Sequence, residues 1–425
     1  MWYQKIVQIF KIPDIRKKIF FVLSILALFR VMANIPIPGI NFENLENFFN
    51  QFQMFGLLNV FTGGALDKLS IVMLGLGPYI TAVIIFQLLT MIFPTLEKLY
   101  KEEGEAGRQK FNQYCRIATA PLAAIQGYGM LTLFQHEGVL EPMSGTVLFA
   151  SIATITAGAM ALMWLGELIT EKGIGNGVSL LIYAGIISAF PNNVGKFILN
   201  YDPSQIPSYI LFFVMAIAVI AGVTLVNEAR RNIPVSYAKR VRGQKMYGGT
   251  STYLPLNVNP AGVMPIIFAL SILLFPSMIA SFLAGKGGTI GSIAIQVKDF
   301  FQNPWVYGVS YFVLVFLFTY FYTAVTFDPK AISTNLQKMG GFIPGIRPGK
   351  STSDFLNYIL NRVLLLGGLF LGVIAIMPQI AGALTGVHNF NFLIGGTSLL
   401  IVVAVVLETW RQVNAQLEMH EYEKF

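Results

Sequence analysis

Ten long runs of apolar residues, separated by shorter stretches that carry most of the charge, constrain this chain more than any other feature. The hydrocarbon core of a bilayer is about 30 Å thick, so a helix needs about 20 apolar residues to cross it. Backbone groups inside the bilayer must pair within the protein, and a helix pairs them all. The predicted spans are residues 19–34, 71–93, 115–134, 147–167, 174–190, 208–227, 260–283, 306–326, 359–377 and 394–412. The sequence therefore predicts an all-α integral membrane protein with about ten transmembrane helices.

Composition supports this class and leaves little material for an active site. Of the 425 residues, 55% are hydrophobic and only 12% are charged, whereas soluble domains carry about 25% charged residues. Cys115 is the single cysteine, and the three histidines, His136, His388 and His420, are far apart in the sequence. A metal site or a nucleophile with its base would have few residues to draw on. We therefore predict no metal, no cofactor and no enzymatic activity.

The basic residues predict the orientation in the membrane. Of the 29 lysines and arginines, 24 fall at the termini and in alternate loops, on one predicted side. The other side holds four lysines, and Arg30 lies inside the outer part of the first span. Because short cytoplasmic loops carry the excess of Lys and Arg, we expect both termini in the cytoplasm, which an even number of spans allows.

An even number of spans can be divided into two halves of five, residues 1–200 and 201–425. Halves with an odd number of helices enter the membrane in opposite senses, as in proteins built from inverted repeats around a central pathway. The two halves show no convincing residue-level repeat. The prediction of two pseudo-symmetric halves thus depends on topology alone.

The stretch Asn59–Tyr79 is moderately apolar but is unsuited to lipid. Asp67 and Lys68 would each cost about 3 kcal/mol at the centre of a membrane helix, and irregular backbone at that depth is tolerated only where protein or a cavity surrounds it. One interpretation is an outer loop that leads into a helix kinked by proline. The other is a short re-entrant helix in a pore mouth, joined to the spanning helix by a flexible break. The residues of that break are Gly75, Gly77 and Pro78.

Acidic residues are nearly absent from the interiors of the predicted spans. Glu167 and Glu408 lie toward the cytoplasmic ends. Transporters coupled to protons or sodium usually carry ionisable groups inside the membrane, so this absence favours a pore. Backbone carbonyls can also bind cations, and an inverted-repeat secondary transporter for a small solute therefore stays as the alternative.

Two predicted cytoplasmic loops, 228–259 and 327–358, are long, basic and rich in turn residues. One contains the basic segment Ser236–Gly243, and the other contains the Gly- and Pro-rich segment Gly341–Lys350. Positive charge on solvated loops explains the composition without any special role. Their length also fits docking arms, because arginine pairs well with carboxylates and phosphates. An acidic protein or ribosomal RNA would suit that chemistry.

Taken together, these motifs resemble the SecY family of protein translocation channels, and they occur in the expected order along nearly the whole chain. The matching segments are Phe61–Ser70, Gly77–Ile80, Gly173–Gly177, Tyr237–Arg240, Asn259–Pro265, Phe275–Pro276, Gly345–Lys350 and Gly395–Ile401.

The resemblance implies a central hourglass pore between the two halves, with an apolar ring and a short plug helix. The ring would consist of Ile80, Ile84, Ile182, Ile267 and Ile401. Spacing alone indicates only that Ile80 and Ile84 share one helix face. The plug would consist of Phe61, Thr62, Gly63, Gly64, Ala65, Leu66, Asp67, Lys68, Leu69 and Ser70, with its hinge at Gly75, Gly77 and Pro78.

The resemblance also implies a function. A channel subunit of the Sec translocase passes unfolded polypeptides across the bacterial cytoplasmic (inner) membrane and releases apolar segments sideways into lipid. The partners implied are the small subunits SecE and SecG, the motor ATPase SecA, the translating ribosome, preproteins with signal sequences, and membrane lipid. The docking residues implied are Lys239, Arg240, Arg242, Arg347 and Lys350.

Overall fold

The computed structural model describes residues 11–38, 44–45, 59, 62–101, 103–199, 203–237, 240–242, 245–247, 251–273, 289–385 and 396–422. Its helices are α2 (Pro13–Met32), α5 (Gly77–Ile92), α6 (Pro94–Lys101), α7 (Gly104–His136), α8 (Gly145–Lys172), α9 (Gly177–Leu199), α10 (Ile206–Glu228), α12 (Thr289–Gln302), α13 (Pro304–Thr326), α14 (Pro329–Lys338), α15 (Lys350–Thr385) and α16 (Gly396–Tyr422). The short helix η1 covers Pro203–Gln205, and a further apolar helix covers Met264–Leu273. Each of the ten predicted spans overlaps one of these helices.

Six helices in the described part of the chain are long and apolar enough to cross a membrane, and they correspond to all or most of α7, α8, α10, α13, α15 and α16. A seventh span results if α5 and α6, which meet at an angle of 111°, are counted together. The described residues of the predicted spans 174–190 and 260–283 form shorter apolar helices, Gly177–Pro191 and Met264–Leu273. For these two spans and for 19–34, the crossing of the membrane stays a prediction.

The spanning helices extend beyond the apolar runs that predicted them. Helix α7 begins 11 residues before the predicted span 115–134, and α15 is 36 residues long. Apolar runs mark only the part of a helix that lipid surrounds. Polar turns at either end continue the same backbone hydrogen bonding, so hydropathy underestimates helix length here.

The two predicted loops 228–259 and 327–358 together contribute the strands of a small antiparallel sheet, which no pattern in the sequence had indicated. Strand β1 (Arg230–Tyr237) lies between β4 (Ser251–Asn257) and β5 (Gly341–Phe342). Strands β2 (Arg240–Arg242) and β3 (Lys245–Tyr247) pair as a separate hairpin. The predicted all-α class is confirmed for a chain that is mostly helical, and these strands are an addition to it in the two loops.

The sheet has a small apolar core of its own, which explains why it forms. Ile233 and Val235 alternate with exposed residues along β1, the period expected of a strand with one buried face. They pack with Leu256 of β4, Leu336 of α14 and Leu356 of α15. The two loops, about 100 residues apart in sequence, thus become one folded unit.

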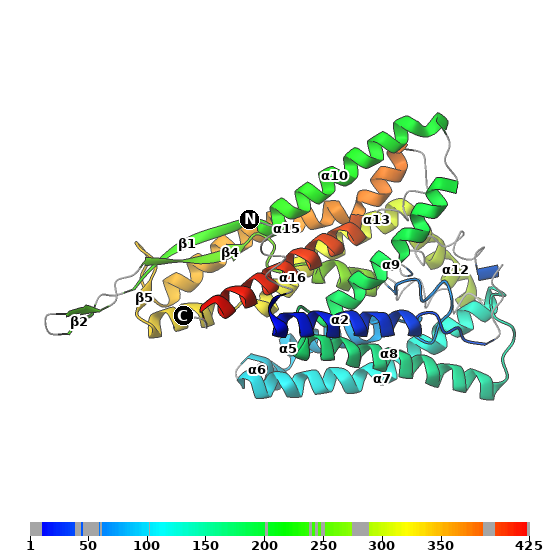
Figure 1. Ribbon diagram of the computed structural model, residues 1–425, viewed down its shortest axis with the longest axis horizontal. Helices are drawn as coiled ribbons and strands as arrows, with labels where there is room; N and C mark the ends of the chain where they lie inside the picture. Colours follow the sequence, from blue (N-terminus) through cyan, green and yellow to red (C-terminus); the bar gives the residue numbers. More distant parts are fainter. Residues whose placement is uncertain are drawn as a thin grey trace.

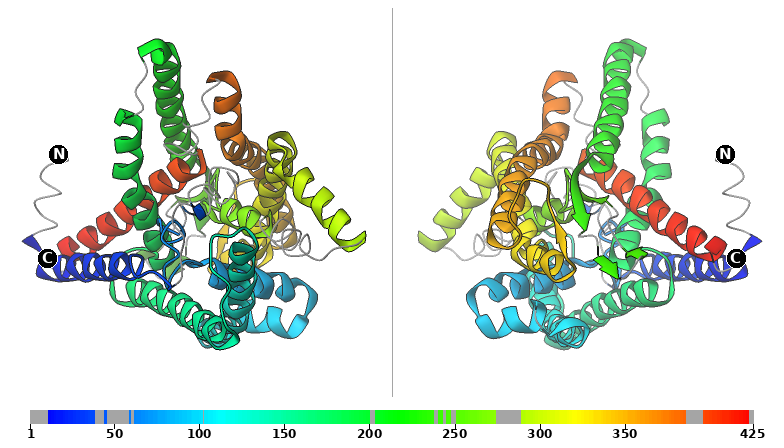
Figure 2. Two further views of the ribbon diagram at one scale, coloured as in Figure 1. Left: turned by 90° about the vertical axis from the view of Figure 1, so that its right-hand side faces the viewer. Right: turned by 90° about the vertical axis from the view of Figure 1, so that its left-hand side faces the viewer.

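Figure 1 shows the helices running along the long axis of the molecule, with the sheet at one end. We call this end the sheet end. Helix α2 begins at the sheet end and α16 ends there (Figure 1). Helix α6 also lies toward the sheet end, whereas α12 lies at the opposite end. Seen along the long axis, the helices from α2 to α8 form the lower part of the bundle, and α10 and α15 form the upper part (Figure 2).

The largest buried apolar cluster joins these two parts. It contains residues of α2, α5, α8, α9, α10, α13, α15, α16 and the helix Met264–Leu273. Helix α9 also packs directly against α16. The candidate site lies within this cluster.

Candidate functional site

The structure brings all five predicted ring residues into one buried cluster. Ile80 and Ile84 come from α5, Ile182 from α9, Ile267 from the helix Met264–Leu273 and Ile401 from α16. Each is at most 6% exposed. Four helices that are widely separated in sequence therefore contribute branched apolar side chains to the same place. Such side chains offer no ligand to an ion and no hydrogen bond to water.

The segment of residues 62–76, which leads into α5, contributes to the same cluster. Ala65, Val72 and Leu76 belong to the cluster of the five isoleucines. Leu66 and Leu69 are equally buried but pack in a second cluster, with residues of α7 and α8. The segment is thus wedged between the central cluster and the α7–α8 pair.

The predicted plug helix is not a helix in the described residues. Phe61 lies outside them, and Thr62–Leu76 is a chain of turns that ends where α5 begins at Gly77. Gly63, Gly64, Leu69 and Gly75 have φ values of 73°, 76°, 41° and 56°. Positive φ is incompatible with a right-handed helix, and glycine adopts it readily. Four such residues within 13 positions keep a helix from propagating.

Single hydrogen bonds close these turns one by one. The N–H groups of Leu69 and Met73 donate to the carbonyls of Leu66 and Ser70, at 3.0 and 2.9 Å. Those of Gly75 and Gly77 donate to Val72 and Leu74, at 2.8 and 3.1 Å. Each bond spans three residues, as in an isolated turn.

The predicted hinge residues lie at the junction between these turns and α5. Gly75 has positive φ, and a Cβ atom there would lie 3.2 Å from Cγ2 of Thr62. Gly77 has open space around it. Pro78 lies in the first turn of α5, where its missing N–H removes no helical hydrogen bond.

Backbone contacts fix the same segment to its neighbours. The N–H of Ile37 donates to the carbonyl of Leu69 at 3.0 Å, and the N–H of Ile71 donates to that of Ile35 at 3.0 Å. From the other side, α8 approaches so closely that a Cβ atom on Gly158 would lie 2.1 Å from the carbonyl oxygen of Ile71. The conformation of the segment therefore depends on the residues that follow α2 and on α8, as well as on its own turns.

The predicted docking residues lie at the sheet end as far as the structure describes them. Arg347 and Lys350 are exposed, at the turn between β5 and α15. Thr352 Oγ1 donates to the carbonyl of Arg347 at 2.9 Å, which fixes the turn. Arg240 and Arg242 belong to β2, and Lys239 lies outside the described residues.

Sequence reasoning missed the ion pairs that join helices near the sheet end. Arg116 of α7 pairs with Glu167 of α8 at 2.6 Å, and Arg411 of α16 pairs with Glu228 of α10 at 2.6 Å. The sequence does show that these charged residues lie near the ends of the apolar runs on one predicted side. Which arginine pairs with which glutamate could not be predicted from these positions, because the sequence does not show which helices are neighbours.

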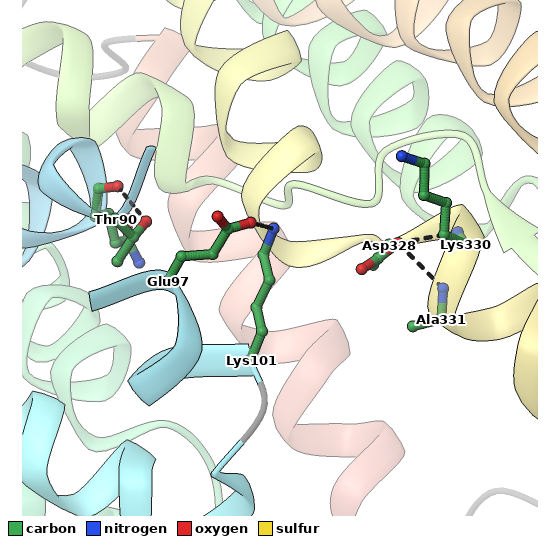
Figure 3. A network of polar contacts seen from close by, with 7 residues as sticks. Thr90, Glu97, Lys101, Asp328, Lys330 and Ala331 are labelled. Atoms are coloured by element: carbon green, nitrogen blue, oxygen red, sulfur yellow. Dashed lines mark hydrogen bonds and ion pairs between the residues drawn. The ribbon is translucent and has the colours of Figure 1, made fainter. Parts of the chain in front are cut away.

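Two shorter elements at the sheet end carry local polar contacts. On α6, Lys101 pairs with Glu97 at 3.0 Å. At the start of α14, Asp328 Oδ1 accepts hydrogen bonds from the N–H groups of Lys330 and Ala331, at 2.9 and 3.1 Å. Figure 3 shows both sets of contacts. Within the described part of the chain, no three His, Cys, Asp or Glu residues are grouped as a metal site requires.

Comparisons with known proteins identify relatives of the whole chain. The family model described as SecY matches residues 70–410. The protein translocase subunit SecY of Streptomyces coelicolor is 41% identical over 433 residues, which is 98% of this chain and 98% of that protein.

Two solved structures have a similar fold. One, described as a protein-conducting channel, has a TM-score of 0.65 and 18% identity, and the match covers 93% of this chain and 91% of that one. The other is the canine Sec61 channel of the endoplasmic reticulum in a complex with the ribosome, with a TM-score of 0.61 and 18% identity over the same shares.

Proposed function

Because this chain belongs to the SecY family of protein translocase subunits, we propose that its five clustered isoleucines form the constriction of a protein-conducting channel. As a family member it is a multi-pass membrane protein and a channel subunit, as the sequence predicted. The observation that carries the proposal is that Ile80, Ile84, Ile182, Ile267 and Ile401 all belong to the largest buried apolar cluster, where the two halves meet. Other apolar residues of the same helices share this cluster, and the family resemblance is what singles out these five.

The chemistry of such a ring suits a channel for unfolded polypeptides. A narrow apolar ring excludes ions by dewetting and binds none of them. It also makes no sequence-specific contact with a passing chain. Branched apolar side chains would pack against one another when the channel is empty and would move apart for a polypeptide of any sequence.

The two halves, residues 1–200 and 201–425, would flank the ring. Helices α5 and α9 supply its members from the first half, and the helix Met264–Leu273 and α16 supply them from the second. The contact of α9 with α16 would close one side. The seam between α5 and α7 on one half and Met264–Leu273 and α13 on the other would open toward lipid, where apolar segments are better solvated.

The segment 61–70 would act as the plug on the outer side of the ring. Ala65 shares the buried cluster with the isoleucines, which supports this role. The break at Gly75, Gly77 and Pro78 would allow the segment to move while α5 stays in place. A chain of turns serves this purpose as well as the expected helix would.

The sheet end would face the cytoplasm of a bacterium, with the chain in the inner membrane and both termini inside. The excess of Lys and Arg on that side supports the orientation. Lys239, Arg240, Arg242, Arg347 and Lys350 would dock SecA or the ribosome there, and SecE and SecG would complete the membrane complex. A related channel fold in complex with the ribosome supports the ribosome as a partner.

The ring is tested by its resting ion conductance. Ile80, Ile84, Ile267 and Ile401 are replaced together by Ser, and the assembled complex is measured in planar bilayers without substrate. The same four positions replaced by Val, which stays branched and apolar, are the matched control. We expect the Ser set to conduct ions at rest and the Val set to stay closed. A Ser set as tight as the parent, in fully assembled complex, would contradict the ring.

A further inference from the structure

Arg30 is the one basic residue that the sequence places inside the outer part of a predicted span. It is half-buried in the last turn of α2. A charge at this depth is costly unless a partner stabilises it, and charges inside membrane segments usually mark a function. The ring and the hinge make no use of Arg30.

The partner of Arg30 is the backbone of the plug segment. Arg30 Nη1 donates to the carbonyl oxygen of Gly63 at 2.5 Å. The two residues are 33 positions apart, so this bond links the end of α2 to the start of the segment. A hydrogen bond from a charged donor is about twice as strong as a neutral one.

Gly63 itself lies where three segments meet. A Cβ atom there would lie 2.7 Å from Cα of Gly185 on α9 and 3.2 Å from Cζ of Phe29 on α2. Ser188 Oγ donates to the carbonyls of Gly185, at 2.7 Å, and of Gly63, at 3.5 Å. The carbonyl of Gly63 is therefore held by donors from two different helices, at a backbone contact that only glycine permits.

Asn34, just after α2, makes a contact near the other end of the plug segment. Asn34 Nδ2 donates to the carbonyl of Arg30 at 2.6 Å, and Asn34 Oδ1 accepts a hydrogen bond from Lys68 Nζ. Residue 63 is thus attached to the last turn of α2, and residue 68 to Asn34, two residues beyond the end of that helix. The two attachments lie on either side of Ala65, which packs against the ring cluster.

We propose that Arg30 is a positioning residue that latches the plug in its seat, through its bond to the Gly63 carbonyl. The inference rests on the proposed plug and adds what determines how firmly that plug is held. Because the bond joins a side chain to a backbone carbonyl, it does not depend on which side chains the plug carries. Losing a hydrogen bond from a charged group shifts an equilibrium by about tenfold to a hundredfold.

The test measures how often the plug leaves its seat. Ala65→Cys places a thiol at a fully buried position of the plug, in a background where Cys115 is replaced by Ala. A membrane-impermeant maleimide, added from the outer side to the assembled complex in membranes, labels that thiol only when the plug is displaced. Labelling rates are compared for Arg30→Met, Arg30→Lys and Arg411→Met. The last is the matched control, since it removes a hydrogen-bonded arginine from the other end of the molecule.

We expect Arg30→Met to raise the labelling rate by about tenfold to a hundredfold, Arg30→Lys to raise it less, and Arg411→Met to leave it unchanged. Arg30→Gln replaces the Met variant if the latter fails to accumulate, with the same expectation. Labelling of the Met or Gln variant within about twofold of the parent, at equal complex abundance, would overturn the latch. The ring is judged separately by conductance, so a latch that fails and a ring that fails give different results.

Discussion

Arg411 on α16 holds the end of α10 through two groups at once. Its guanidinium lies 2.6 Å from Oε1 of Glu228 and 2.9 Å from the carbonyl oxygen of Asn227. The bonded segments are more than 180 residues apart in sequence. The contact fixes α10 at the point where the chain leaves the helix for strand β1.

This pair gives a first prediction, for stability. The Arg411 and Glu228 side chains are 35% and 47% exposed, so solvent screens much of their attraction. We expect Arg411→Met to lower the free energy of unfolding by about 1 kcal/mol. A double-mutant cycle with Glu228→Gln, measured by thermal denaturation of the purified complex, isolates the pair. A coupling energy of zero would show that the contact contributes nothing.

A second prediction concerns the close approach of α8 to Ile71, in the turns that precede α5. In Gly158→Ala, the new methyl would lie 2.1 Å from the carbonyl oxygen of Ile71, so one backbone must move. We expect a loss of about 1–3 kcal/mol, the usual cost of overpacking. Gly145→Ala is the control in the same helix, because a Cβ atom there meets nothing within 4 Å. Equal stabilities of the two variants, in the same denaturation assay, would contradict the packing of α8 against Ile71.

A third prediction concerns the core of the sheet. Ile233 is 2% exposed and packs against residues of β4, α14 and α15. We expect Ile233→Ala to cost about 2–5 kcal/mol locally, as buried Ile→Ala changes do. Faster amide hydrogen exchange across β1 and β4 is the measurement. Thr252→Ala, at an exposed position of β4, serves as the control and should leave exchange nearly unchanged.

A fourth prediction tests docking. Arg347→Glu reverses an exposed charge at the tip between β5 and α15, without touching a buried contact. We expect motor-driven secretion into membrane vesicles to fall at least tenfold, about the effect of losing one charge-assisted contact, while folding and complex assembly survive. Lys338→Glu, an exposed charge reversal at the end of α14, is the control. Secretion that persists in Arg347→Glu would remove the docking role.

Apolar runs predicted the positions of the membrane helices because lipid selects for hydropathy along the chain. The ten predicted spans each overlap a helix, and among the residues that the structure describes six or seven of these helices are long and apolar enough to cross a membrane. Composition and spacing could not predict that Ile80 and Ile401 lie in the same buried cluster. Residues from different helices meet only through tertiary packing, and the family resemblance supplied that relation.

Local patterns failed at two other places for identifiable reasons. The sheet arises from a strand period of two in β1, between Arg230 and Tyr237, which the basic charge of the loop obscured. The plug segment was expected to be helical, and its glycines at positive φ prevent it. The pair Gly63–Gly64 favours a turn over a helix, since glycine is the residue that adopts positive φ most readily.

The turns of residues 62–76 have a consequence for how the proposed plug would move. A helix forms and melts cooperatively, because each hydrogen bond depends on the turn before it. In this segment, the bond from Leu69 to Leu66 and the bond from Gly75 to Val72 share no residues, so one can break while the other stays intact. Displacement of the proposed plug would therefore not require the cooperative unwinding of a helix.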